Sequence, residues 1–123
     1  MSGKRIDIRW RDLDALGHVN QAVYQTYLEE ALDHWLRGVL GLGEGEVWNY
    51  VAARVAIDYR SELKLGDGQV VGACALRRVG NRSVTVGIEL RAADGRLAAE
   101  AETVIVKREA ITDGERALLE AAA

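Results

Sequence analysis

The chain has 123 residues, 49% of them hydrophobic, which is enough for one domain with its own core. Its net charge of -3 excludes a global basic surface, so we expect no nucleic-acid partner. The single cysteine, Cys74, excludes an internal disulfide and is typical of a reducing compartment. No apolar run approaches the roughly 20 residues of a membrane span, and no signal-peptide core is visible. We therefore expect a cytoplasmic protein that does not enter a membrane.

The first third of the chain predicts a strand followed by a long helix. Ile6, Ile8 and Trp10 alternate with charged residues, which predicts a half-buried strand over residues 5–11. A loop follows over residues 12–19. From Asn20, a favourable N-cap, apolar residues recur at steps of three and four, which predicts a helix over residues 21–40 that ends at Gly41.

The rest of the chain predicts four more strands joined by short turns. Residues 51–59 alternate with period two, placing Val51, Ala53 and Tyr59 on one face. Three further strands are expected over residues 69–79, from Ser83 to about residue 90, and over residues 97–108, with glycine-containing turns between them. Residues 112–123 form a tail or a short helix.

This order predicts an α+β domain over residues 1–111. Short turns make neighbouring strands antiparallel, and the helix must bury its apolar stripe against the sheet. The expected architecture is a five-stranded antiparallel sheet wrapped around one long helix. One helix leaves the sheet edges open, so we also expect a homodimer or a dimer of dimers, with sheets joined edge to edge.

The densest group of polar residues lies in the loop that precedes the helix. A helix N-terminus offers free N–H groups and a partial positive charge, which stabilise a developing oxyanion. Asp14 can fold back over this turn as a nucleophile or general base, or Asp12 and Asp14 can simply cap the loop. His18 either orients a water or satisfies the loop backbone, and Asn20 caps the helix or fixes the loop. No second His or Cys is near, so we expect no metal site.

Residues 9–31 resemble the signature of hot-dog-fold acyl-CoA thioesterases of the 4-hydroxybenzoyl-CoA thioesterase-like family. That signature reads aromatic-x-Asp-x-Asp-x-x-Gly-His-Val-Asn-Asn, then Tyr and a Tyr/Phe-x-Glu stretch. The chain follows it from Trp10 to Asn20 and departs at Gln21, where Asn is frequent. Residues 56–59, 65–67 and 81–84 are similar to later family patterns, so the resemblance covers almost the whole chain.

The resemblance implies hydrolysis of an acyl-CoA thioester, with Asp14 as catalytic carboxylate and coenzyme A as part of the substrate rather than a cofactor. The carbonyl oxygen would face backbone N–H groups near Asn20 and Gln21. The family's helix acid falls on Glu29, which can also belong to a solvated helix face. Further substrate contacts would come from two tyrosines that wall the acyl pocket and from a polar hairpin that binds phosphates. These residues are Tyr24, Tyr27, Arg77, Arg78, Asn81, Arg82 and Ser83.

Two other functions stay open at this point. Hydrolysis of acyl-carrier-protein thioesters would require an exposed basic patch for an acidic partner, and this acidic chain offers little sign of one. Non-catalytic binding of acyl-CoA would leave Asp14 without a purpose. The sequence specifies neither the acyl group nor the route by which Asp14 acts.

Overall fold

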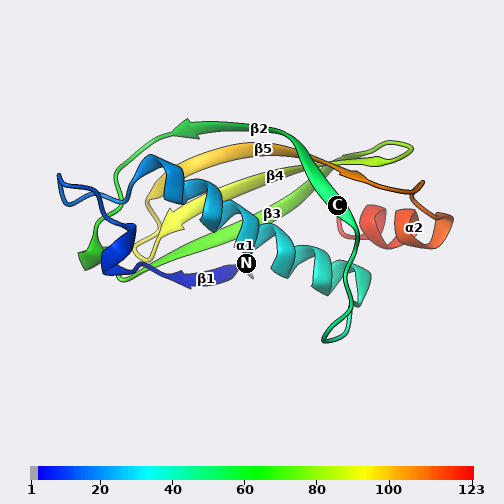
Figure 1. Cartoon of the computed structure of the whole chain (residues 1–123), viewed down its shortest axis with the longest axis horizontal. Coiled ribbons are helices and arrows are strands. Elements are labelled where there is room, and N and C mark those ends of the chain that lie inside the picture. The colour runs from blue at the N-terminus through cyan, green and yellow to red at the C-terminus, as the bar shows by residue number, and fades with distance from the viewer. Residues whose placement is uncertain (1–2) are drawn as a thin grey trace.

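The computed structural model describes residues 3–123 as a five-stranded antiparallel sheet curved around one long helix (Figure 1). The strands are β1 (Lys4–Asp7), β2 (Tyr50–Tyr59), β3 (Gln69–Val79), β4 (Ser83–Ala92) and β5 (Leu97–Lys107). Their order across the sheet is β1-β3-β4-β5-β2. The helices are α1 (Gln21–Leu40) and α2 (Asp113–Ala121), with short 3-10 turns η1 (Trp10–Asp12) and η2 (Leu65–Asp67). The predicted α+β architecture is confirmed.

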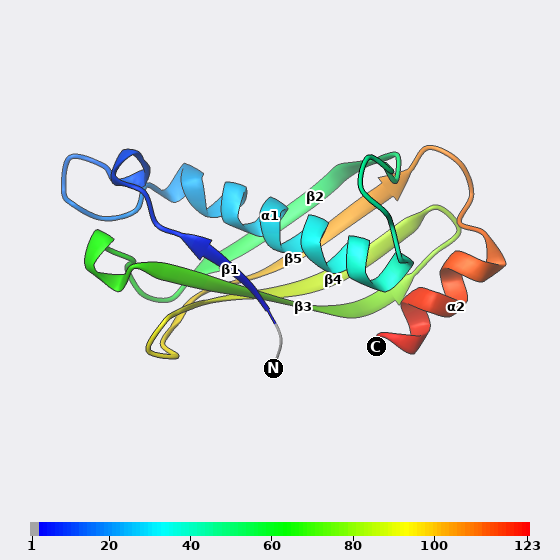
Figure 2. The ribbon, with the colours of Figure 1, turned by 90° about the horizontal axis from the view of Figure 1, so that it is seen from below.

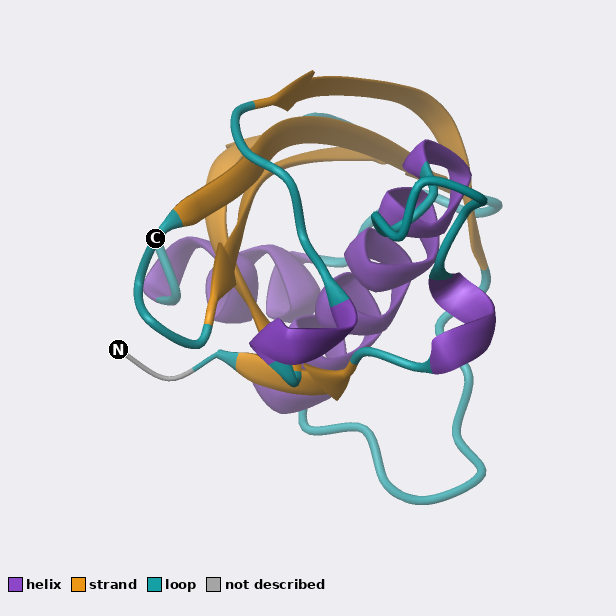
Figure 3. Cartoon of the chain, turned by 90° about the vertical axis from the view of Figure 1, so that its left-hand side faces the viewer, coloured by secondary structure: helices purple, strands orange, loops and turns teal. Residues whose placement is uncertain are grey.

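Helix α1 lies under the concave face of the sheet, as Figure 3 shows. Its bounds are the predicted ones because both caps form. The Asn20 side chain accepts the Ala22 N–H, while Gly41 adopts a φ of 66° and donates its N–H to the Arg37 carbonyl. The helix buries a stripe of mostly apolar side chains, which are Tyr24, Tyr27, Leu28, Ala31, Leu32 and Leu36. This stripe and the helix-facing side chains of β4 and β5 form most of one core.

The first strand is shorter than its alternation predicts. Ile6 and Ile8 are buried as expected, but β1 ends at Asp7 and Trp10 is 79% exposed. The cause lies two residues after Trp10. The Asp12 carboxylate accepts the Arg9 N–H at 3.0 Å, which winds the chain into η1 and turns Trp10 outward.

Strand β2 also departs from the predicted pattern, because a bulge interrupts it. Its pairing with β5 shifts between Ala52 and Arg54. Ala52 pairs with Ile105 and Val55 pairs with Thr103, so both lie on the helix side of the sheet. The prediction that Val51 and Ala53 share a face with Tyr59 is therefore wrong. Within residues 3–123, β2 pairs with β5 alone and forms one edge of the sheet.

The C-terminal helix α2 closes the end of the sheet opposite the start of α1 (Figure 2). Leu119 is fully buried in the common core. Glu115 ties the helix down, since its carboxylate accepts from Lys107 Nζ at 2.8 Å and from Trp48 Nε1 at 2.6 Å. Of the two alternatives left open for residues 112–123, a tail or a short helix, the structure has the short helix. No helix of the described part of the chain is long and apolar enough to cross a membrane.

Candidate active site

The loop before α1 is built around the Asp14 side chain. Asp14 Oδ1 accepts the Leu16 N–H at 2.9 Å and the His18 N–H at 3.2 Å. The Asp14 N–H in turn donates to the His18 carbonyl at 2.7 Å, and Gly17 closes the turn at a φ of 82°. Within residues 3–123, Oδ2 of Asp14 makes no hydrogen bond. One oxygen therefore holds the loop, and the other is available for chemistry.

Asp12 anchors this loop to the core. Only 2% of Asp12 is exposed, and its Oδ2 accepts the Tyr27 hydroxyl at 2.8 Å. Burial by itself raises the pKa of this carboxyl, but the hydrogen bonds from the Arg9 backbone, Tyr27 and the Arg9 side chain outweigh burial and hold the pKa below its usual value. Tyr27 is fully buried, and its hydroxyl donates its hydrogen bond to Asp12. It therefore does not wall an open pocket, contrary to the prediction.

The first turn of α1 leaves one backbone donor free. Ala22 donates to Asn20 Oδ1 at 2.9 Å, and Val23 donates to the Asn20 carbonyl at 2.9 Å. The Asn20 N–H itself donates to the Asp12 carbonyl at 2.8 Å, so it is not available to a ligand. Among residues 3–123, the Gln21 N–H has no acceptor. Of the two backbone donors expected near Asn20 and Gln21, only the second is free, and it lies at the positive end of the helix.

A cavity of about 480 Å³ brings these groups together. Five predicted site residues line it, which are Asp14, His18, Asn20, Gln21 and Tyr24. Its opposite wall is residues 59–62, at the end of β2 and just beyond it. Asp14 and the first turn of α1 therefore line one open cavity. Within residues 3–123, no group of three or more His, Cys, Asp or Glu could hold a metal ion.

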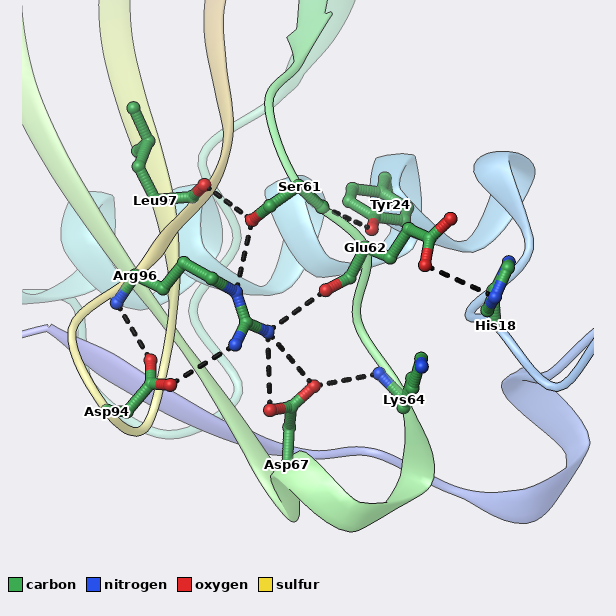
Figure 4. Close-up of polar contacts among 9 residues, drawn as sticks. All are labelled: His18, Tyr24, Ser61, Glu62, Lys64, Asp67, Asp94, Arg96 and Leu97. Atoms are coloured by element: carbon green, nitrogen blue, oxygen red, sulfur yellow. Dashed lines mark hydrogen bonds and ion pairs between the residues drawn. The ribbon is translucent and has the colours of Figure 1, made fainter.

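The opposite wall is held in place by contacts that the sequence did not reveal (Figure 4). His18 Nε2 lies 3.2 Å from Glu62 Oε2. Arg96 donates to Ser61 Oγ at 3.2 Å and to the Glu62 carbonyl at 3.0 Å. The same guanidinium also contacts Asp67 at 3.2 Å, which joins this wall to η2. These contacts join segments tens of residues apart, so no local sequence pattern predicts them.

Tyr24 and Tyr59 close one end of the cavity. Their rings meet edge to face with centroids 5.1 Å apart. The Tyr24 hydroxyl donates to the Ser61 carbonyl at 3.4 Å, and burial raises the pKa of Tyr24. The Tyr59 hydroxyl donates to the Gln21 carbonyl at 3.4 Å. Tyr24 thus walls the site, and Tyr59 is a wall residue that sequence reasoning missed.

The remaining predicted residues lie elsewhere in this chain. Glu29 lines a different cavity, farther along α1. The predicted phosphate-binding hairpin joins β3 to β4 near α2, at the end opposite the Asp14 loop (Figure 2). The 11 residues of β3 separate the two ends by about 35 Å at roughly 3.3 Å per residue. The structure therefore does not bring Arg77, Arg78, Asn81, Arg82 and Ser83 to Asp14 within one chain.

Comparison with known proteins identifies the family to which this chain belongs. The model of the thioesterase-like superfamily matches residues 8–115, and the chain belongs to this superfamily. A thioesterase from Thermus thermophilus, solved with coenzyme A and zinc, is 31% identical with a TM-score of 0.84, covering 97% of this chain and 92% of that one. A candidate acyl-CoA thioesterase from Xanthomonas campestris is 31% identical with a TM-score of 0.73, covering 87% and 95%.

The hot-dog fold extends to more distant structures. SAV2348 of Staphylococcus aureus, solved with CoA, has a TM-score of 0.83 at 15% identity, covering 97% of this chain and 81% of that one. At that identity the likeness concerns the fold alone. The comparison with curated proteins gave no match. The resemblance found in residues 9–31 is thus confirmed at the level of the family and its fold.

Proposed function

We propose that this protein hydrolyses the thioester of an acyl-CoA, with Asp14 as the carboxylate that drives the reaction. One observation carries the proposal. The Asp14 carboxylate lines the same cavity as the first turn of α1, where the Gln21 N–H has no partner within residues 3–123. Membership of the thioesterase-like superfamily and the Thermus relative solved with coenzyme A support a CoA thioester as the substrate.

The proposed chemistry uses the two ends of this cavity. The thioester carbonyl oxygen accepts the Gln21 N–H, where the helix dipole stabilises the negative charge of the tetrahedral intermediate. Asp14 Oδ2 either takes a proton from water as the water oxygen attacks, or attacks the carbonyl carbon itself to give an anhydride that water then cleaves. In both routes the carbon–sulfur bond breaks and the CoA thiolate takes a proton. The products are a carboxylic acid and free CoA.

His18 supports Asp14 through its backbone. Its N–H donates to Asp14 Oδ1 at 3.2 Å, and its carbonyl accepts the Asp14 N–H at 2.7 Å. The imidazole is held from the other side by Glu62 at 3.2 Å. We therefore infer that His18 positions the carboxylate and that its ring borders the water that attacks.

Replacing Asp14 in two ways separates chemistry from loop structure. In Asp14→Asn the amide oxygen can still accept the Leu16 and His18 N–H groups, so the loop is retained while the charge is lost. We expect kcat for a panel of acyl-CoA esters to fall by about 10²–10⁴-fold, the usual worth of a positioned acid or base. Asp14→Ala removes both roles and should also lower the melting temperature. Free CoA is followed with a thiol-reactive dye.

Asp113→Asn is the matched control, because Asp113 is an exposed carboxylate at the start of α2 and far from the cavity. It should leave kcat unchanged. Retention of most of the activity by a folded Asp14→Asn protein would refute the role of Asp14. A wild-type protein that releases no CoA from any ester of the panel would refute the function itself.

We also infer that the working unit is a homodimer joined through the β2 edges. The outer edge of β2 has no strand partner within residues 3–123, and Val51 on it is 66% exposed. A second copy is also the simplest way to bring the β3–β4 hairpin to an Asp14 site. Sedimentation should give twice the chain mass, and Val51→Lys should shift it toward the monomer. A monomeric wild-type protein with full activity would contradict this inference.

A further inference from the structure

A second cavity, of about 340 Å³, lies beside the proposed site in the same groove between α1 and β2. Leu28 of α1 and Val55 of β2 form its apolar walls, and Thr103 and Ile105 of β5 lie at its floor. This volume is at the lower end of the range for small-molecule sites. Five of its eleven lining residues are polar, so the cavity combines apolar walls with several polar groups, which are Gln25, Glu29, Asp33, Tyr50 and Thr103.

One of those polar groups lacks a partner. Thr103 is only 4% exposed, and its hydroxyl makes no hydrogen bond to any residue that the structure describes. Its side chain points toward α1, because its β5 neighbours on that face, Ala101 and Ile105, are both buried there. A buried hydroxyl is nearly always hydrogen-bonded in a folded protein, and valine would fill the same volume without one. The unpaired hydroxyl therefore suggests a ligand that completes it.

The two cavities are close enough for one substrate to occupy both. Gln21 borders the first cavity, and Glu29, two helical turns farther along α1, borders the second. The separation is about 12 Å at 1.5 Å of rise per residue. An extended chain spans this distance with about ten bonds, since three bonds of an extended backbone cover about 3.6 Å.

Tyr59 borders the first cavity and lies four residues beyond Val55, which borders the second. It is 46% exposed, and its hydroxyl makes only the long contact of 3.4 Å to the Gln21 carbonyl. Its ring also packs edge to face on Tyr24 with centroids 5.1 Å apart, so a rotation of Tyr59 that lets an acyl chain pass from one cavity to the next breaks this contact and the long hydrogen bond.

Charge decides which part of the substrate enters the second cavity. Glu29 and Asp33 line it on the helix side. Burial raises the pKa of Tyr50 on the opposite side, and the charges of Asp33 and Glu29 raise it further. Arg37 pairs with Asp33 at 3.0 Å and partly offsets this effect on Tyr50, so within residues 3–123 Glu29 supplies the unpaired negative charge of the rim. That charge disfavours the phosphates of coenzyme A and favours a neutral group that can donate a hydrogen bond.

We propose that the second cavity holds the far end of the acyl group, and that the Thr103 hydroxyl binds a terminal hydroxyl there. The substrate class is then a medium-chain ω-hydroxyacyl thioester. This inference rests on the proposed hydrolysis of acyl-CoA and deepens it.

The test compares decanoyl-CoA with 10-hydroxydecanoyl-CoA in the wild type, Thr103→Val and Thr103→Ser. The wild type should prefer the hydroxy ester by about 3- to 10-fold in kcat/KM, the worth of one hydrogen bond. Thr103→Val should hydrolyse both esters at similar rates, and Thr103→Ser should keep the preference. Thr103→Val should also melt no lower than the wild type, because the hydroxyl it loses is unpaired in the free protein.

Titration of the same esters into Asp14→Asn measures binding without turnover. Equal preference in the wild type and Thr103→Val, with both esters hydrolysed, would overturn the role of Thr103 while hydrolysis stands. Binding that favours the hydroxy ester through Thr103, in a protein whose wild type cleaves neither ester, would retain the cavity assignment and overturn hydrolysis. An absence of both binding and turnover would overturn both.

Discussion

The hydrogen bond between Tyr27 and Asp12 holds the loop before α1 against the helix, and removing this hydrogen bond tests the structure directly. The two oxygens are 2.8 Å apart and both residues are buried. Hydrogen bonds to a charged group contribute about 1.5–3 kcal/mol. Asp12 keeps the Arg9 N–H at 3.0 Å in Tyr27→Phe, so we expect a loss of about 2 kcal/mol. For a domain of this size, that lowers the melting temperature by about 6–10 °C.

The loss should depend on pH in a defined direction. The pKa of Asp12 is lowered by folding from its ordinary value of 3.8, so its ionised form stabilises the fold at pH values above about 3.8. That stabilisation disappears as the pH falls through the lower pKa of the folded state. In Tyr27→Phe this pKa moves back up, so less stabilisation remains to be lost. The difference between wild type and variant is therefore full at pH 7 and shrinks below pH 3.8.

Urea unfolding followed by circular dichroism at several pH values between 7 and 3 measures this difference. Tyr24→Phe is the matched control, because the Tyr24 hydroxyl donates to the neutral Ser61 carbonyl at 3.4 Å. It should cost under about 1 kcal/mol and show no dependence on acidic pH. A Tyr27→Phe difference that stays constant down to pH 3 would refute the argument that the hydrogen bond acts through the Asp12 charge.

Two further predictions concern the ends of the helices. Burial raises the pKa of Glu115, but hydrogen bonds from Lys107, Thr112 and Trp48 lower it to about 2. Glu115→Gln should therefore lose about 1.5–3 kcal/mol at pH 7, and the loss should vanish as the pH falls from 4.5 toward 2, as urea unfolding would show. Gly41→Ala should cost about 1–2 kcal/mol, since Gly41 has a φ of 66°. Gly38→Ala, inside the helix and facing open space, should instead gain about 0.5–1 kcal/mol. A Gly41→Ala protein as stable as Gly38→Ala would contradict the cap assignment.

The parts of the fold that the sequence predicts are those with local causes. The limits of α1 follow from Asn20 and Gly41, each of which acts on backbone groups within four residues. Strand β3, Gln69–Val79, matches its predicted range because glycine-containing turns flank it on both sides. The prediction that Trp10 belongs to the first strand is wrong for a non-local reason. Its place in the alternation is regular, but the buried Asp12 needs the Arg9 N–H and bends the chain before Trp10 can join the strand.

The candidate site also has a part that the sequence predicts from local causes and a part that it does not. Asp14, His18 and Gln21 belong to one short segment, so a local pattern suffices to group them. The wall that faces them comes from residues 59–62 and from Arg96, whose contacts with Ser61 and Asp67 join parts of the chain 29 to 35 residues apart. No sequence pattern within a single segment predicts such a contact.

The bulge in β2 shows how one residue decides which side chains line the groove between α1 and β2. Past the bulge, Val55 and Tyr59 pair with the buried Thr103 and Ala99 and so face α1. In a regular ladder, the residues of β2 before the bulge would keep the alternation predicted from the sequence, and Ala52 would point away from the helix. Because Ala53 is the extra residue, Ala52 faces the same groove as Val55 and lines the second cavity with it. The place of Ala52 in the lining of the second cavity therefore depends on a shift of register that hydrophobic alternation cannot reveal.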